Sequence, residues 1–242
     1  MLELREIPSQ VISGLSSLQL FSIMDSQEHI QGDIDLYYVP SIQTLLNSHM
    51  LQRCLKILQV FCPDINLLHL LFPYLEKLVV MHCWKLKDVT VNLEKEVVHS
   101  TFPRHQYLYH LSEVKIESCA NLMKLTCLIY ASNLKLLNIL DCTSLEEVIQ
   151  VGESGVSEIE SDLGLFSRLV LEYMRMSLLF PSLRVMNVVR CPNLRKLPFD
   201  SNLKISKNLE EIKGEQESWA ELEWEDQTIK HNLTPYFKPQ DW

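Results

Sequence analysis

The fold is decided by one stretch of sequence, Leu75-Glu-Lys-Leu78-Val-Val80-Met-His-Cys83-Trp-Lys-Leu86. Its frame is a leucine, two alternating apolar residues, a cysteine and a final leucine at fixed spacing. Three more copies begin at Leu111, Leu134 and Leu183, and they place a cysteine in the same slot at Cys119, Cys142 and Cys191. Four copies that share a cysteine at one position indicate a repeated structural unit.

The spacing within one unit predicts a short strand followed by a turn. Leu78 and Val80 are two residues apart, the period that places side chains on one face of a strand. Cys83 follows where the chain turns away, and its small thiol can be buried there with a weak hydrogen bond to the backbone. One unit alone cannot bury its apolar side, so the units must stack with parallel strands. The pattern is typical of a leucine-rich repeat. It predicts an α/β solenoid, a curved horseshoe with a parallel β-sheet on its concave face and short helices and loops on its convex face.

The repeats are predicted to occupy residues 1–214, with degenerate units at 1–70 and 146–176, and a non-repeating cap or tail at 215–242. About six to eight repeats are expected. The clear copies begin 36, 23 and 49 residues apart. The first interval predicts an insertion at 94–110, and the last predicts a poorly matched repeat near residues 166–173. A helix is expected at 41–50 and a solvated acidic loop at 146–162.

Composition excludes several classes of function. The formal net charge of −9 argues against binding nucleic acid through the phosphate backbone. Gly-rich phosphate-binding motifs are absent from the sequence, so no cofactor and no small-molecule substrate are predicted. The most apolar stretch is interrupted by Pro63 and Pro73, so no membrane span is expected. Seven cysteines without dense spacing indicate reduced thiols and a cytoplasmic protein.

The repeat cysteines also raise two chemical alternatives. A zinc site needs closely spaced ligands that converge, whereas these cysteines are 23 to 49 residues apart and should form a ladder, so no metal site is predicted. A cysteine nucleophile could use His82, His105 or His110 as a base, but no third orienting group is recognisable. We therefore predict that the protein is not an enzyme.

The outward-facing side of the predicted sheet is the candidate binding surface. Its mixed apolar, amide and charged side chains resemble a protein-binding surface more than a sugar or nucleic-acid site. A repeat surface that binds no partner would have the same mixed composition. The predicted partner-binding residues are Lys77, Val79, Met81, Lys115, Glu117, Asn138, Leu140, Asn187, Val189 and Arg190. Trp219 and Trp224 are interpreted as a cap over the last repeat, with a partner motif as the alternative.

Several longer segments resemble one protein family. Residues 180–202, beginning Phe180-Pro-Ser-Leu-Arg, are similar to the C-terminal repeats of plant intracellular disease-resistance proteins that combine a coiled coil, a nucleotide-binding domain and leucine-rich repeats. The segments 214–219, 222–226 and 230–237 resemble the closing part of that family, and 12–21 and 51–54 resemble its middle repeats.

The resemblance implies a role in pathogen recognition and in holding a receptor inactive, inside the cell. Implied partners are proteins: a pathogen effector, a guarded host protein or a nucleotide-binding domain. The family's coiled coil and nucleotide-binding domain are missing from this sequence, so no nucleotide-binding residues can be carried over. The alternative expectation is a truncated, non-signalling remnant with no partner of its own.

Overall fold

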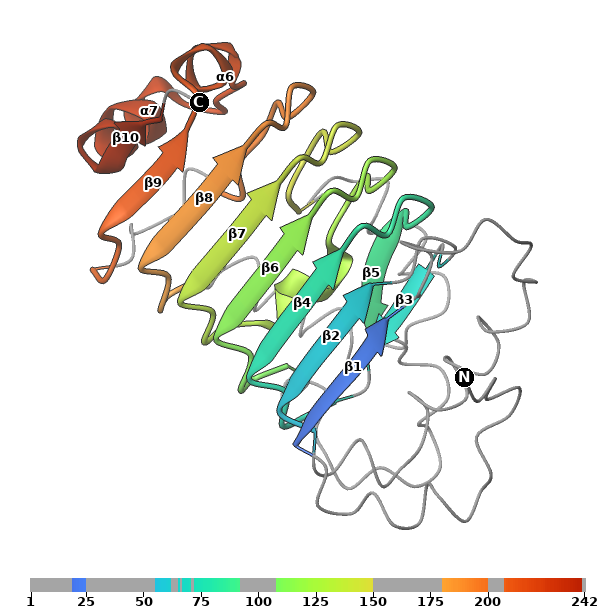
Figure 1. Cartoon of the computed structure of the whole chain (residues 1–242). Helices are drawn as coiled ribbons and strands as arrows, with labels where there is room; N and C mark the ends of the chain where they lie inside the picture. Colours follow the sequence, from blue (N-terminus) through green and yellow to red (C-terminus); the bar gives the residue numbers. More distant parts are fainter. Residues whose placement is uncertain are drawn as a thin grey trace, which may run out of the picture.

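The computed structural model describes residues 19–24, 55–61, 65, 67–70, 72–91, 108–149, 180–199 and 207–240. Within these ranges the main feature is an eight-stranded sheet in which every neighbouring pair is parallel (Figure 1). The strands, in sheet order, are β1 (Leu20–Met24), β2 (Ile57–Phe61), β4 (Lys77–Met81), β6 (Glu113–Glu117), β7 (Leu136–Leu140), β8 (Val185–Val189), β9 (Glu211–Gly214) and β10 (Phe237–Pro239).

A smaller sheet pairs β3 (Leu67–Leu70) with β5 (Asp88–Val91), again in parallel. The described helices are short: the 3-10 helices η3 (Thr126–Tyr130) and η4 (Thr234–Tyr236), and the α-helices α6 (Gln216–Glu221) and α7 (Gln227–Leu233). None of the described helices has the length and apolar character needed to cross a membrane. The predicted α/β class with a parallel sheet is confirmed, and this arrangement is compatible with the expected repeat architecture.

The register of the sheet follows the repeat frame. Leu78 of β4 pairs with Val114 of β6, which pairs with Leu137 of β7, which pairs with Met186 of β8. All four side chains are fully buried, as the alternation in the sequence predicted. The second apolar position of each strand, two residues later, is buried as well, so the same side of every unit forms one continuous core.

Each clear unit leaves its strand through a residue in the left-handed backbone conformation. These residues stand immediately before the repeat cysteines, with φ values between 54° and 56°, and they are His82, Ser118, Asp141 and Arg190. The left-handed region costs an L-residue roughly 1–2 kcal/mol. The turn therefore carries a local conformational cost that the packing of the repeat must offset.

The repeat cysteines are buried and bonded to the backbone, as predicted. Each donates its S–H to the carbonyl oxygen two residues earlier, with a sulfur–oxygen distance of 3.4 Å for Cys83, Cys119, Cys142 and Cys191. Three of them, Cys83, Cys119 and Cys191, also lie 3.7–4.0 Å from a carbonyl oxygen on the preceding strand of the sheet. The cysteine therefore satisfies backbone acceptors at the point where the chain turns into the core.

The interval of 49 residues between Leu134 and Leu183 separates two strands that are direct neighbours in the main sheet. We predicted a poorly matched repeat near 166–173, but β7 pairs directly with β8 along all five residues. The length of the interval therefore does not add a strand between β7 and β8, and the repeat near 166–173 stays a prediction. The residues of that segment, 150–179, lie outside the described ranges, as do the predicted helix at 41–50 and most of the insertion at 94–110.

Away from the main sheet, one buried carboxylate ties two units together. Asp88 at the start of β5 accepts hydrogen bonds from the backbone N–H and the hydroxyl of Thr126, at 3.1 Å and 2.8 Å. This contact holds the first residue of η3 against the preceding unit. Burial raises the pKa of Asp88 above its usual value of 3.8, while the bonds from Thr126 and the charge of Lys124 act in the opposite direction.

Residues 215–240 complete the described chain with a compact aromatic cluster. Trp219 on α6 is buried and stacks on Phe237 of β10, with ring centroids 4.2 Å apart, and Trp224 meets Trp219 edge-on at 5.1 Å. β10 pairs with β9 and so continues the main sheet beyond the last repeat strand. The tryptophans thus pack inward, which agrees with their interpretation as part of a cap.

Candidate partner-binding face

The candidate site is the side of the main sheet that faces away from the core, here called the open face. It is formed by the first, third and fifth residues of β4, β6, β7 and β8. These residues are Lys77, Val79, Met81, Glu113, Lys115, Glu117, Leu136, Asn138, Leu140, Val185, Asn187 and Val189. Most are partly exposed, in contrast to the buried residues that alternate with them.

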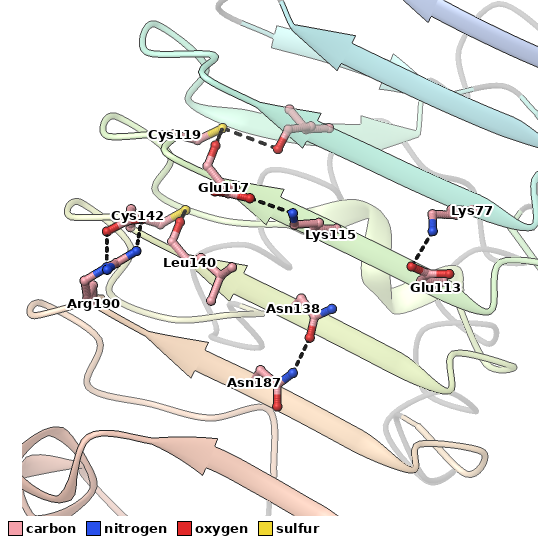
Figure 2. A network of polar contacts seen from close by, with 12 residues as sticks. Lys77, Glu113, Lys115, Glu117, Cys119, Asn138, Leu140, Cys142, Asn187 and Arg190 are labelled. Atoms are coloured by element: carbon pink, nitrogen blue, oxygen red, sulfur yellow. Dashed lines mark hydrogen bonds and ion pairs between the residues drawn. The ribbon is translucent and has the colours of Figure 1, made fainter. Parts of the chain in front are cut away.

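Ion pairs hold the charged side chains of the open face in place (Figure 2). Lys77 Nζ lies 2.6 Å from a carboxylate oxygen of Glu113 on the neighbouring strand. Lys115 Nζ lies 2.7 Å from Glu117, two residues along the same strand. Partly exposed pairs of this kind contribute little stability, typically 0–1 kcal/mol. Their effect is to fix the positions of four charges on the surface.

Two asparagines meet at the centre of the open face. The side-chain amide of Asn187 on β8 donates to Oδ1 of Asn138 on β7, directly opposite it in the register. Oδ1 of Asn187 is itself buried and has no hydrogen-bond partner among the described residues. A buried acceptor without a donor carries an energetic cost, so this position lowers the stability of the folded sheet.

The apolar residues of the open face differ in accessibility. Met81, Leu136 and Leu140 are partly exposed. Glu117 pairs with Met81 on one side and with Leu140 on the other, so it separates these two apolar side chains. Val79 and Val189 point to the same side but are only 5% and 2% exposed. Both belong to the predicted binding set, yet their side chains offer almost no area to a partner. Any apolar contact on this face falls mainly on the four partly exposed apolar residues, Met81, Leu136, Leu140 and Val185.

The strand-exit edge of the open face ends in a second polar cluster. Arg190 forms a two-point ion pair with Asp141, at 2.5 Å and 2.7 Å, which links adjacent left-handed turns. The backbone N–H of Arg190 donates to a carboxylate oxygen of Glu215 at 2.6 Å. Hydrogen bonding to Asp141 raises the pKa of Arg190, and Glu117 and Glu215 add to that effect. The predicted residue Arg190 thus lies among three carboxylates at the rim.

The structure brings the predicted set together, because its members lie on four adjacent strands and the turn after β8. Sequence reasoning missed the ion-pair network, the Asn138–Asn187 contact and the role of Glu215. The matching repeat positions of the two asparagines were a usable signal. The ion pairs were harder to foresee, because Glu113, Lys115 and Glu117 could pair within a strand or across strands.

The cysteine–histidine alternative for catalysis can be compared with the geometry of the first clear unit. His82 is exposed at the turn, whereas the sulfur of Cys83 is buried and donates to the carbonyls of Met81 and Val60. The alternative base His110 stacks on Tyr74 and meets Tyr109 edge-on at the strand-entry edge, and His105 lies outside the described residues. Across the described ranges, His, Cys, Asp and Glu side chains do not gather in threes as a metal site requires.

Comparisons with known proteins confirm the family resemblance. No protein-family model matches the chain. Disease resistance protein SUMM2 of Arabidopsis thaliana is 31% identical over 221 residues, which cover 81% of this chain and 23% of that protein. Putative disease resistance protein At4g10780 and disease resistance protein RPS5 of the same plant are each 26% identical over 94% of this chain, covering 29% and 27% of their own lengths. The chain thus spans about a quarter of the length of these relatives.

Proposed function

We propose that this chain, related over most of its length to plant disease-resistance proteins, is a non-catalytic protein-recognition module in plant defence. In this proposal the main sheet is the strand layer of a leucine-rich-repeat solenoid, and the open face is the surface that contacts a protein partner. The parallel register and the recurring strand–turn–cysteine unit support the solenoid. The relatives support the defence role.

The partly exposed open face is the observation that carries the proposal. Parallel sheets are usually covered on both faces, because their strands are built from apolar residues. Here Met81, Leu136 and Leu140 remain partly exposed on a parallel sheet, beside charges already fixed by ion pairs. Apolar side chains within a polar surround are the usual composition of a protein interface.

Non-catalytic action is supported by how the repeat cysteines are used. Their S–H groups donate to backbone carbonyls in every clear unit, and those bonds are part of the turn. The partner classes we propose are a pathogen effector, a guarded host protein and a nucleotide-binding domain of a related receptor. The last is the most accessible probe, because it can be produced from a known relative.

The test is calorimetric titration of the folded 242-residue chain with such a nucleotide-binding domain. We expect saturable binding that weakens at least tenfold in Leu140→Lys. Glu117 lies directly opposite Leu140 and can accept the new charge, so this variant should remain folded. The matched control is Glu217→Lys on α6, an exposed charge change away from the open face, which should bind like the parent.

The outcomes separate the proposal from its alternative. Equal affinity of Leu140→Lys and the parent would mean that the open face does not bind this partner. A cooperatively unfolding chain that gives no binding heat would favour the non-signalling remnant, or a partner from one of the other two classes. The same pair of variants can then be applied to candidate effectors and host proteins.

A further inference from the structure

Two repeat cysteines, Cys142 and Cys191, occupy equivalent positions on neighbouring strands. Leu140 pairs with Val189, and in each strand one left-handed residue separates that position from the cysteine. Neighbouring strands lie about 4.8 Å apart, within the Cα separation of about 4.4–6.8 Å that a disulfide requires. The sulfur of Cys191 also reaches to 3.9 Å from the carbonyl oxygen of Ile139, on the strand that leads to Cys142. The two thiols therefore lie side by side.

Cys191 is among the residues that line a surface pocket. The pocket lies where β8 and β9 meet α6 and is partly open to solvent. Val188, Gly214, Glu215 and Trp219 are among its other lining residues. Cys191 is 2% exposed, whereas the other three repeat cysteines have no exposed surface, so within this set it is the one nearest to solvent.

The remaining repeat cysteines are fully buried and do not line this pocket. Cys83 and Cys119 form a similar pair, because Met81 is in register with Glu117 and each cysteine follows two residues later. This second pair therefore has the same strand geometry without the opening to solvent. It provides an internal control for the effect of access.

Hydrogen bonding between the two thiols makes them unequal. It lowers the pKa of Cys191 and raises the pKa of Cys142, although burial opposes the change at Cys191. The thiolate is the form of cysteine that reacts with peroxides and disulfides. The accessible member of the pair is thus also the one that loses its proton more readily.

We propose that Cys191 is a site of peroxide oxidation and that Cys142 resolves it as a disulfide. The Cys191 thiolate attacks one oxygen of hydrogen peroxide, so that an S–O bond forms, the O–O bond breaks and hydroxide leaves as water after taking a proton. The Cys142 thiol then gives its proton to the departing hydroxide as its sulfur attacks the Cys191 sulfur. The S–S bond forms, the S–O bond breaks and a second hydroxide leaves as water. The two sulfurs together lose two electrons, which the two peroxide oxygens gain.

The test treats the folded chain with hydrogen peroxide, blocks remaining thiols after denaturation and maps the peptides by mass spectrometry. We expect a Cys142–Cys191 disulfide and no Cys83–Cys119 disulfide. In Cys142→Ser the sulfenic acid at Cys191 has no resolving thiol, so dimedone should label Cys191. In Cys191→Ser the disulfide should be lost and Cys142 should stay reduced.

Met123 reports whether the oxidant reached the protein, because its side chain is 54% exposed. Circular dichroism during the reaction shows whether the chain is still folded. Reduced Cys191 in a folded sample whose Met123 has become the sulfoxide would overturn the proposal. Equal formation of the Cys83–Cys119 disulfide would also overturn it, because nearness to solvent would then not decide which pair reacts.

Discussion

The backbone N–H of Arg190 donates to a side-chain oxygen of Glu215 at a distance of 2.6 Å. In the three preceding units the corresponding N–H, at His82, Ser118 and Asp141, donates instead to the carbonyl at the end of the next strand. After β8 that carbonyl is replaced by a carboxylate from the segment that leads into α6. Glu215 therefore ends a ladder of hydrogen bonds that runs along the strand-exit edge of the sheet.

Replacing this acceptor should weaken the end of the sheet. We expect Glu215→Ala to lower the free energy of unfolding by about 0.5–1.5 kcal/mol, the usual contribution of one hydrogen bond. Glu215→Gln should lose less, because its amide oxygen can still accept. Urea unfolding of both variants measures the difference, with Glu217→Ala on α6 as the control. Equal stability of the alanine and glutamine variants would contradict the role of this bond.

At the left-handed turns, a glycine variant should be more stable than an alanine variant. Ser118 has a φ of 54°, a region that glycine adopts without the steric cost of a Cβ atom. We expect Ser118→Gly to be more stable than Ser118→Ala by about 0.5–1 kcal/mol, after allowing for the greater freedom of glycine in the unfolded chain. The alanine variant removes the hydroxyl but keeps the Cβ atom, so the comparison isolates the backbone effect. A glycine variant no more stable than alanine would contradict it.

Gly214 at the end of β9 is required for a different reason. A Cβ atom placed there would lie 2.9 Å from the carbonyl oxygen of Val188, a backbone atom that cannot move aside easily. We expect Gly214→Ala to destabilise the chain by about 1–3 kcal/mol, as overpacking does elsewhere. The measurement is thermal unfolding followed by tryptophan fluorescence, which reports on Trp219 and Trp224 nearby. An unchanged melting temperature would mean that β9 shifts freely.

Neighbouring leucines on opposite sides of β7 should respond differently to truncation. Leu137 is fully buried in the core, and Leu137→Ala should cost about 2–5 kcal/mol. Leu136 lies next to it on the open face and is partly exposed, so Leu136→Ala should cost clearly less. Chemical denaturation of the two variants gives the comparison. Similar losses would mean that the open face is covered as completely as the core.

Asp88 predicts a specific dependence of stability on pH. Burial raises its folded-state pKa above 3.8, so the folded chain binds this proton more tightly than the unfolded chain. Stability then falls as pH rises through the interval between the unfolded and folded pKa values. Subtracting the profile of Asp88→Asn should reveal this loss from about pH 4 upward. A difference profile that rises with pH would show that the bonds from Thr126 outweigh burial.

The sequence predicted those parts of the fold that depend on local spacing. The inward positions of Leu78, Val114 and Leu137 follow from a period of two residues, and the buried cysteines follow from their constant distance to those positions. The interval between Leu134 and Leu183 was less informative, because chain length does not distinguish another repeat from an insertion. The direct pairing of β7 with β8 is visible only in the structure.

The candidate site was less predictable, because burial on the open face depends on neighbours from other strands. Val79 and Val189 point outward as expected, but both are buried. Val79 lies between Gln59 and Lys115 in the register, two longer side chains that are distant from it in sequence. The bond between Arg190 and Glu215 likewise joins residues that share no repeat position. Such contacts emerge only when the units are stacked.

The central claim is that the open face binds a protein partner, and one affinity ratio tests it most directly. Leu136→Lys changes the open face beside Glu113, which lies opposite it and can accommodate the charge, while the adjacent core residue Leu137 is left intact. We predict that this variant unfolds like the parent but binds a related nucleotide-binding domain at least tenfold more weakly in calorimetric titration. Binding by the parent with an unchanged dissociation constant for Leu136→Lys would contradict the claim.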